Sequence, residues 1–181
     1  MPATKDMRST VILVNEQDIQ LGTAEKLAAH EQGLLHRAFS IFLFRNGKKG
    51  RELLLQQRAN DKYHSAGLWT NSCCSHPSPG ENIIEAAYRR LKEELGITTA
   101  VLSDVGQFHY IAHFNNGLTE NELDHVLVGE YCDEELNPDP AEIQAYCWME
   151  IAALKKALRE KPETFTPWLE KALAIAEKVY R

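Results

Sequence analysis

The sequence of 181 residues has no long apolar run, little cysteine and no excess of positive charge. No apolar stretch approaches the roughly 18 residues of a membrane-spanning helix, so we expect no membrane partner. The formal net charge of −6 argues against a surface that coats nucleic acid, and an anionic ligand would have to be held by local cations. The four cysteines form no C-x-x-C pair, and the adjacent Cys73 and Cys74 suit a disulfide framework poorly, which predicts a reducing cytoplasm.

The ends of the chain carry no recognisable targeting signal. The first six residues contain no apolar signal-peptide core, and the last three form no lipidation motif. Hydrophobic residues make up 44% and charged residues 25%, which is typical of a globular protein. The length predicts one domain, residues 1–181, with a sizeable core.

Apolar periodicity predicts strands first, one inserted helix, and two helices at the end. We expect strands at 11–15, 36–44, 52–57, 106–114, 119–131 and 143–149, and helices at 24–30, 83–95, 151–161 and 168–180. Thr23 is the predicted N-cap of the first helix, and Gly33 and Gly96 are placed to end the first two helices. This order indicates an α+β domain with α/β/α layers, in which helices flank a mixed β-sheet.

The stretch from Thr70 to Pro77 places a thiol and an imidazole two residues apart. Because side chains alternate along a strand, Cys74 and His76 would point to the same side. Cys73 and Cys74 could instead be small core residues, an interpretation that suits Cys73 better.

The helix predicted at 83–95 carries a cation and a carboxylate on one flank of its apolar stripe. Arg90 and Glu94 are four residues apart, so they lie together at the margin of the buried face. Two interpretations remain open: a functional site at the edge of the core, or an ordinary i,i+4 salt bridge.

Five further side chains are candidate ligands for a divalent metal ion. Three imidazoles and two carboxylates suit Mn²⁺, Zn²⁺ or Mg²⁺. Glu120 and Glu122 are two apart on one strand and share a face. No local motif unites the five, and isolated histidines are more often structural. The five residues are His30, His36, His76, Glu120 and Glu122.

The segment from Ser75 to Ile97 resembles the Nudix signature G-x5-E-x7-R-E-U-x-E-E-x-G-U, in which U is apolar. Ser75 stands in place of the first Gly, and Arg90 replaces the Glu that follows Arg89. In a Nudix hydrolase that Glu helps to hold metal ions on a diphosphate. An Arg repels metal ions and attracts phosphate oxygens, which indicates a conversion from hydrolysis to diphosphate binding.

From Gly22 to about Trp168 the chain closely resembles the type I isopentenyl-diphosphate delta-isomerases, a Nudix-fold family. Five stretches carry the resemblance: EKLAAH at 25–30, GLLHRAFS at 33–40, TNSCCSHP at 70–77, ENE at 120–122 and FTPW at 165–168. The resemblance implies a Nudix-like fold and the conversion of isopentenyl diphosphate into dimethylallyl diphosphate, a step that supplies isoprenoid precursors. It also implies that the five candidate ligands bind one catalytic metal ion.

The resemblance assigns further roles to single residues. Cys74 and Glu122 would be the acid–base pair, with Tyr110 supporting Glu122 and Glu94 binding Mg²⁺ together with the substrate diphosphate. Trp168 would stabilise a carbocation through its π face, on the order of 2 kcal/mol when desolvated. Four cations are candidates to hold the diphosphate: Lys26, Arg58, Lys62 and Arg90. Lys62 lies in a polar loop and could instead be merely solvated.

Alternative interpretations stay open at this stage. Tyr110 could be core packing, and Trp168 could anchor a helix. A Nudix pyrophosphohydrolase and a non-catalytic Nudix-like binding module are the rival functions, and the expected partner is a small molecule, with the protein a monomer or weak homodimer. The remaining histidines are interpreted as structural or surface residues: His64, His109, His113 and His125.

Overall fold

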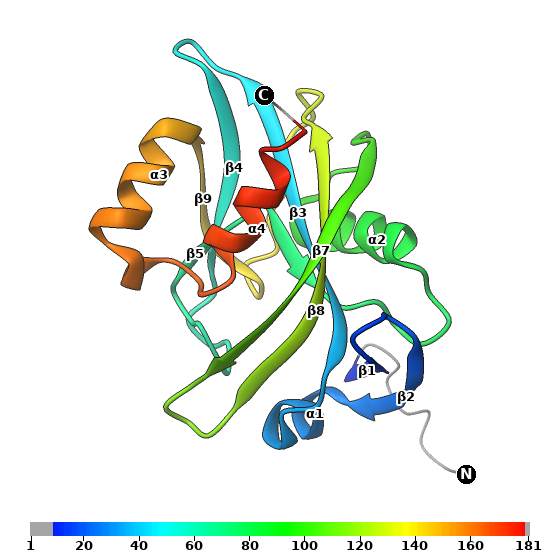
Figure 1. The fold of residues 1–181 in the computed structure, drawn as a ribbon. Helices are drawn as coiled ribbons and strands as arrows, with labels where there is room; N and C mark the ends of the chain where they lie inside the picture. Colours follow the sequence, from blue (N-terminus) through cyan, green and yellow to red (C-terminus); the bar gives the residue numbers. More distant parts are fainter. Residues whose placement is uncertain (1–8, 180–181) are drawn as a thin grey trace.

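The computed structural model describes residues 9–179 as one mixed sheet with flanking helices (Figure 1). The strands are β1 (Thr10–Val14), β2 (Gln20–Glu25), β3 (His36–Asn46), β4 (Arg51–Arg58), β5 (Trp69–Thr70), β6 (Cys73–Ser75), β7 (Leu102–His113), β8 (Thr119–Glu130) and β9 (Ile143–Glu150). The helices are α1 (Lys26–Gln32), α2 (Ile83–Leu95), α3 (Ile151–Glu160) and α4 (Leu169–Ala176), with a 3-10 turn at Pro162–Thr164.

Strand β3 lies at the centre of the sheet and connects its parts. It runs parallel to β8 and antiparallel to β1, β4 and β6. Phe39 pairs with Ser75 of β6 and with His125 of β8, so these two strands flank β3 on opposite edges. Strands β7 and β9 extend the sheet antiparallel to β8 and β4.

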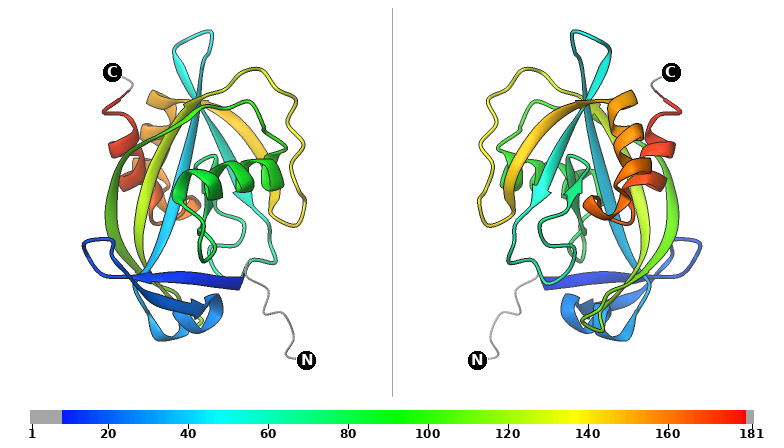
Figure 2. Two further views of the ribbon diagram at one scale, coloured as in Figure 1. Left: turned by 90° about the vertical axis from the view of Figure 1, so that its right-hand side faces the viewer. Right: turned by 90° about the vertical axis from the view of Figure 1, so that its left-hand side faces the viewer.

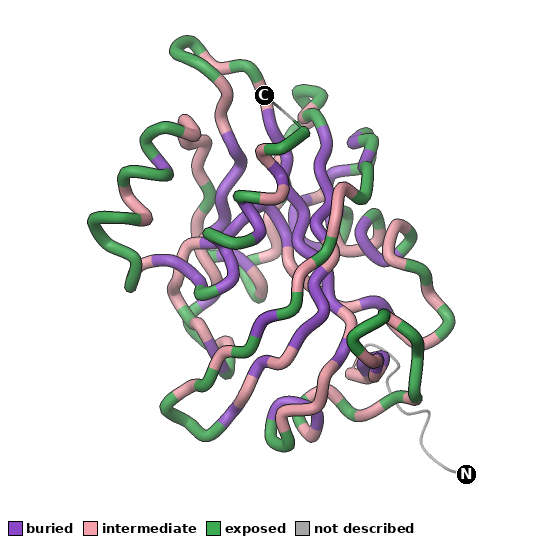
Figure 3. Tube along the Cα trace, viewed as in Figure 1, coloured by how far each residue is buried: buried purple, intermediate pink, exposed green. Residues whose placement is uncertain are grey.

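The alternation of β3 buries its two faces in two different cores. Phe39, Ile41 and Leu43 pack on one face with the apolar side of α2. Phe42 and Phe44 pack on the other face with α3 and α4. Figure 2 shows α2 on one side of the sheet and the C-terminal helices on the opposite side, and Figure 3 shows buried backbone along the central strands. The predicted α+β fold with α/β/α layers is therefore confirmed.

The region around the first helix corrects the sequence-based assignment. Residues 20–25 form strand β2, which pairs with β1, and the helix begins at Lys26 instead of Ala24. Its N-cap is Glu25 and not Thr23, because the Glu25 carboxylate accepts hydrogen bonds from the amides of Leu27 and Ala28. Pairing with β1 thus overrides the local preference for a Thr cap.

The other helix ends agree more closely with the sequence signals. Gly33 and Gly96 both adopt the left-handed conformation, with φ of 63° and 72°, and end α1 and α2 as expected. Asn82 and Glu85 form a capping box at the start of α2. Helix α4 is shorter than predicted, ending at Ala176, and the predicted end at Tyr180 lies outside the described residues. Among the helices of residues 9–179, none is long and apolar enough to cross a bilayer.

Candidate active site

The predicted metal ligands meet beside a cavity of about 280 Å³, which is lined by His76, Glu120 and Glu122. His30, His36, His76 and Glu122 each offer a ligand atom, and these atoms lie within 4.8 Å of one another. They come from four separate segments: α1, the start of β3, the residue after β6, and β8. Folding therefore brings together a donor set that no local motif united.

The hydrogen bonds of two imidazoles fix which ring nitrogen faces the cluster. His30 donates from Nδ1 to the carbonyl oxygen of Lys26 at 2.7 Å, and His36 donates from Nδ1 to that of Leu34 at 2.8 Å. A carbonyl oxygen only accepts, so in a neutral imidazole each Nε2 presents a lone pair. Both Nε2 atoms are buried without a hydrogen-bond partner.

This arrangement fits a bound cation. His36 Nε2 lies 3.3 Å from Glu122 Oε1, so the lone pair of a neutral His36 ring would face a carboxylate oxygen. Such a contact is unfavourable unless a positive charge, either a proton on the ring or a bound cation, lies at these two atoms. Histidines that donate their other ring N–H to a carbonyl are typical metal ligands, and the mixed nitrogen and oxygen donors suit a borderline-to-hard divalent ion.

Tyr110 connects the two carboxylates of β8. Its hydroxyl lies 2.7 Å from Glu120 Oε2 and 2.8 Å from Glu122 Oε2. The contact exists because Glu120 and Glu122 share a strand face, as their spacing predicts, and Tyr110 is the β7 residue opposite Glu122. Tyr110 is thus more than packing, although its ring also stacks on Phe108 with centroids 5.6 Å apart.

The two carboxylates have opposite protonation tendencies. Burial would raise the pKa of Glu122, but the contacts with the imidazoles of His36 and His76 outweigh burial and place that pKa well below the usual range. Burial, followed by the charge of Glu122, raises the pKa of Glu120 well above the usual range.

His64 lines the cavity, although the sequence did not mark it as a candidate for the site. It was expected to be structural or on the surface, yet it is only 7% exposed and lines the cavity. Its Nε2 lies 3.1 Å from Glu120 Oε1, and its ring is stacked between those of Phe114 and His30. His30, His64 and Glu120 form a second potential ligand set. His64 lies in a polar loop without periodicity, so no sequence signal marks it.

The Cys74 thiol is enclosed by hydrogen-bonding groups. It donates to Asn71 Oδ1 at 2.9 Å, and Trp168 Nε1 donates to the sulfur at 3.1 Å. The hydroxyl oxygens of Ser40 and Thr70 lie 3.7 Å from the sulfur. Trp168, only 3% exposed, therefore forms the wall beside the thiol.

Cys74 and His76 line the same cavity, as alternation along the strand predicts, but no hydrogen bond joins them among the described residues. His76 hydrogen-bonds Glu122 Oε1 at 2.8 Å instead. Burial, followed by the charge of Asp124, raises the pKa of the Cys74 thiol to about 12. The thiol is therefore protonated in the substrate-free protein.

Four cations line the same cavity: Lys26, Arg58, Lys62 and Arg90. Burial lowers the pKa of Lys26, and the positive charges of Lys62, Arg58 and Arg90 lower it further. Like charges held this close together are typical of a site for an anion. The structure thus brings the four predicted cations together.

Arg90 forms the i,i+4 salt bridge that the sequence suggested, and it also lies at the edge of the core, where the sequence suggested a site. It forms the i,i+4 ion pair with Glu94, at 2.5 Å, and it also lines the cavity. Glu94 is buried and accepts a hydrogen bond from Gln56 Nε2 at 3.1 Å. On the adjacent flank of α2, Arg89 binds Glu81 with two hydrogen bonds of 2.7 and 2.8 Å.

The fold and this helix define a member of the NUDIX class. The family model described as NUDIX domain matches residues 34–169. Two solved structures share the fold: DR0079 from Deinococcus radiodurans, with a TM-score of 0.71, 18% identity, and coverage of 92% of this chain and 98% of that one, and a MutT protein from Methanosarcina mazei, with a TM-score of 0.62, 22% identity, and coverage of 81% and 96%.

Curated relatives narrow this class further. The isopentenyl-diphosphate Delta-isomerase of Photobacterium profundum is 46% identical over 164 residues, covering 90% of this chain and 91% of the relative. That of Serratia proteamaculans is 48% identical over 162 residues, covering 90% and 88%. The chain belongs to the isopentenyl-diphosphate Delta-isomerase family.

Proposed function

We propose that Cys74 and Glu122 carry the two proton transfers of an enzyme that converts isopentenyl diphosphate into dimethylallyl diphosphate. The isomerase activity follows from membership of the family. The roles of the residues rest on one observation: a thiol and a carboxylate line one cavity together with a cluster of cations. Their strands, β6 and β8, flank β3 on opposite edges.

The reaction adds a proton to one carbon of an alkene and removes a proton from another. Two groups placed on different sides of the substrate perform this 1,3 shift without moving. In our proposal Glu122 donates and Cys74 accepts toward dimethylallyl diphosphate, and the roles exchange in the reverse direction. Each group must therefore be protonated at the start of one direction of the reaction and deprotonated at the start of the other. In the substrate-free protein the raised pKa of Cys74 and the lowered pKa of Glu122 both correspond to the reverse direction, in which Cys74 donates.

Protonation of an unactivated alkene produces a tertiary carbocation, which the site has to shield from water. Trp168 supplies a buried aromatic wall beside the thiol. Its π face would stabilise the cation by roughly 2 kcal/mol. Hydrogen bonds from Trp168, Ser40 and Thr70 oppose the effect of burial on the thiol and would stabilise a thiolate when Cys74 acts as base.

We propose that His30, His36, His76 and Glu122, with Glu120 nearby, hold one divalent ion, Mn²⁺, Zn²⁺ or Mg²⁺; the buried donor set supports this. When bound, the ion supplies positive charge that makes a neighbouring carboxyl a stronger acid. The cations Lys26, Arg58, Lys62 and Arg90 would bind the diphosphate, with Mg²⁺ held by Glu94. Arg90 occupies the position at which a Nudix hydrolase carries a Glu, which favours binding over hydrolysis.

We infer a cytoplasmic enzyme that acts on a small molecule. Cys73, Cys74, Cys132 and Cys147 are all free thiols, as a reducing compartment requires. A monomer or weak homodimer, without nucleic-acid or membrane partners, stays a prediction.

Metal titration of three variants tests the proposed roles. Glu120→Gln should lose mainly metal affinity, so excess metal should restore part of the rate. Glu122→Gln cannot donate a carboxylic proton, so its loss should lie in kcat and persist at saturating metal. Cys74→Ala should behave like Glu122→Gln with normal bound metal. If Glu122→Gln regains near-normal turnover once metal is saturating, Glu122 is only a ligand.

A further inference from the structure

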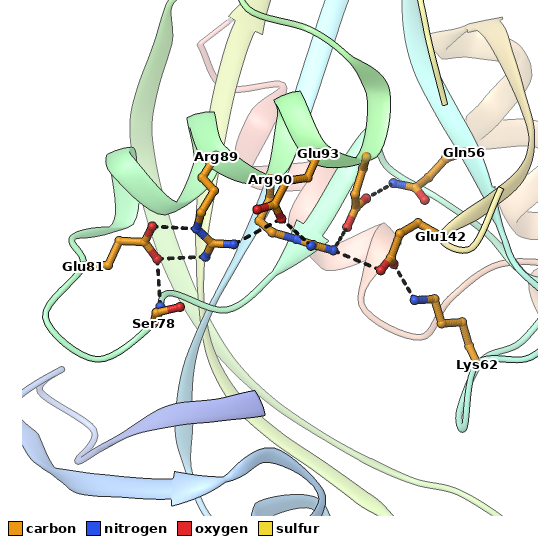
Figure 4. A network of polar contacts seen from close by, with 9 residues as sticks. Gln56, Lys62, Ser78, Glu81, Arg89, Arg90, Glu93 and Glu142 are labelled. Atoms are coloured by element: carbon orange, nitrogen blue, oxygen red, sulfur yellow. Dashed lines mark hydrogen bonds and ion pairs between the residues drawn. The ribbon is translucent and has the colours of Figure 1, made fainter. Parts of the chain in front are cut away.

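Glu142 places a carboxylate among the cations of the proposed diphosphate subsite. It lines the cavity and forms an ion pair with Lys62, and its Oε1 lies 3.4 Å from Arg90 Nη2 (Figure 4). Lys62 lies in the loop after β4 and Arg90 lies on α2, so one carboxylate bridges two cations from different parts of the fold.

The backbone holds Glu142 in this position. Its carbonyl oxygen accepts a hydrogen bond from the amide of Ala59 at 3.0 Å, and its own amide donates to Asp139 at 3.0 Å. The loop is further fastened to the end of α2, because the amide of Asp139 donates to the carbonyl of Glu94 at 2.9 Å and that of Asn137 to Leu95 at 2.8 Å. Backbone hydrogen bonds thus hold Glu142 in place beside Lys62 and Arg90.

The carboxylate of Glu142 is charged and faces the space that an anion would enter. Burial would raise its pKa, but the hydrogen bond and charge of Lys62 and the charge of Arg90 outweigh burial and lower it. Glu94, on the other side of Arg90, is also buried against the cavity. A bare diphosphate held by the four cations would therefore meet carboxylates as well, Glu94 and Glu142 among them.

We propose that Glu142 determines which form of the diphosphate the subsite accepts: it disfavours the bare anion and favours the anion that arrives with a divalent cation. This inference rests on the proposed function, because it assumes that the cations hold a diphosphate. A carboxylate repels a bare polyanion at short range. A divalent cation bound to the phosphate oxygens turns this repulsion into attraction, because hard cations can be coordinated by carboxylate and phosphate oxygens at the same time.

Binding of inorganic pyrophosphate, measured by calorimetry with and without Mg²⁺, tests the proposal on the metal-loaded enzyme. The wild type should bind pyrophosphate more tightly with Mg²⁺ than without it. Glu142→Gln should bind bare pyrophosphate about tenfold more tightly than the wild type, because one like charge is removed from beside the anion. Its preference for Mg²⁺ should shrink accordingly.

Two control variants separate charge from structure. Glu93→Gln removes another carboxylate that binds Arg90, at 2.7 Å, but Glu93 is exposed and lies outside the cavity lining, so both affinities should match the wild type. Glu142→Asp keeps the charge on a shorter side chain and should retain the preference for Mg²⁺.

The outcomes are distinguishable. Unchanged or weaker binding of bare pyrophosphate by Glu142→Gln, in a protein with a normal melting temperature, would overturn the proposal and leave Glu142 as a support for Lys62 and Arg90. Failure of the wild type to bind pyrophosphate under either condition would overturn the diphosphate subsite itself, and this inference with it.

Discussion

Replacing Tyr110 by Phe removes one oxygen atom from the centre of the site and leaves the ring in place. The lost hydroxyl lies within 2.8 Å of both Glu120 and Glu122. The ring itself is 5% exposed and contacts Phe108 and Trp168, so Phe fills the same space. The variant therefore tests the hydroxyl without creating a cavity.

The expected loss follows from the type of hydrogen bond. A hydrogen bond to a charged group contributes about 1.5 to 3 kcal/mol, and each 1.36 kcal/mol of activation free energy changes a rate about tenfold. If the hydroxyl orients Glu122 for proton transfer, kcat should fall by about 10- to 150-fold. KM should stay within about twofold, because Tyr110 contacts none of the four cations, and bound metal should be normal, because all five proposed ligands remain.

Steady-state kinetics together with metal analysis measure these quantities. Tyr63→Phe is the matched control, since Tyr63 lines the same cavity but its hydroxyl donates to neither carboxylate. A kcat within twofold of the wild type for Tyr110→Phe would refute the positioning role and return Tyr110 to packing. A fall in bound metal that accounts for the lost rate would show that the hydroxyl serves the metal site instead.

Three further predictions concern other walls of the cavity. Trp168→Phe should retain more activity than Trp168→Leu, because a smaller π face still stabilises positive charge; equal activity of the two folded variants would make Trp168 a packing anchor. Alkylation at pH 7.5, followed by peptide mapping, should modify exposed Cys132 before Cys74, because the pKa of about 12 leaves Cys74 with little thiolate. The thiolate fraction of Cys74 should rise about tenfold per pH unit below that pKa; rapid modification of Cys74 at pH 7.5 would contradict this. His64→Phe should keep the stacking on Phe114 but lose the contact with Glu120, so the variant protein should bind metal more weakly. An unchanged metal affinity would mean that His64 has only a structural role.

Strand alternation and helix capping made much of the fold predictable. Side chains at odd and even positions of β3 point to opposite faces, so Phe39 and Phe42 could be assigned to different faces. The ends of α1 and α2 could be predicted from Gly33 and Gly96. The start of α1 could not, because the pairing of β2 with β1 is a long-range contact that favours extended backbone at residues 20–25. Local propensity carries no information about that contact.

The site shows the same division. Three histidines could be proposed as metal ligands because they lie in stretches that resemble a known family: His30, His36 and His76. His64 and Glu142 lie in loops, where neither period nor motif marks a side chain that folding turns inward. Alternation places Cys74 and His76 on the same side of the strand, but it does not specify that His76 hydrogen-bonds Glu122.

Proton NMR of isopentenyl diphosphate incubated with the enzyme and Mg²⁺ in D₂O tests the central claim most directly. A proton shift that uses Glu122 and Cys74 predicts dimethylallyl signals with solvent deuterium incorporated, because both groups exchange with water between turnovers. Arg90 within the Nudix helix predicts an intact diphosphate. Release of inorganic phosphate or pyrophosphate without any allylic isomer would contradict the account.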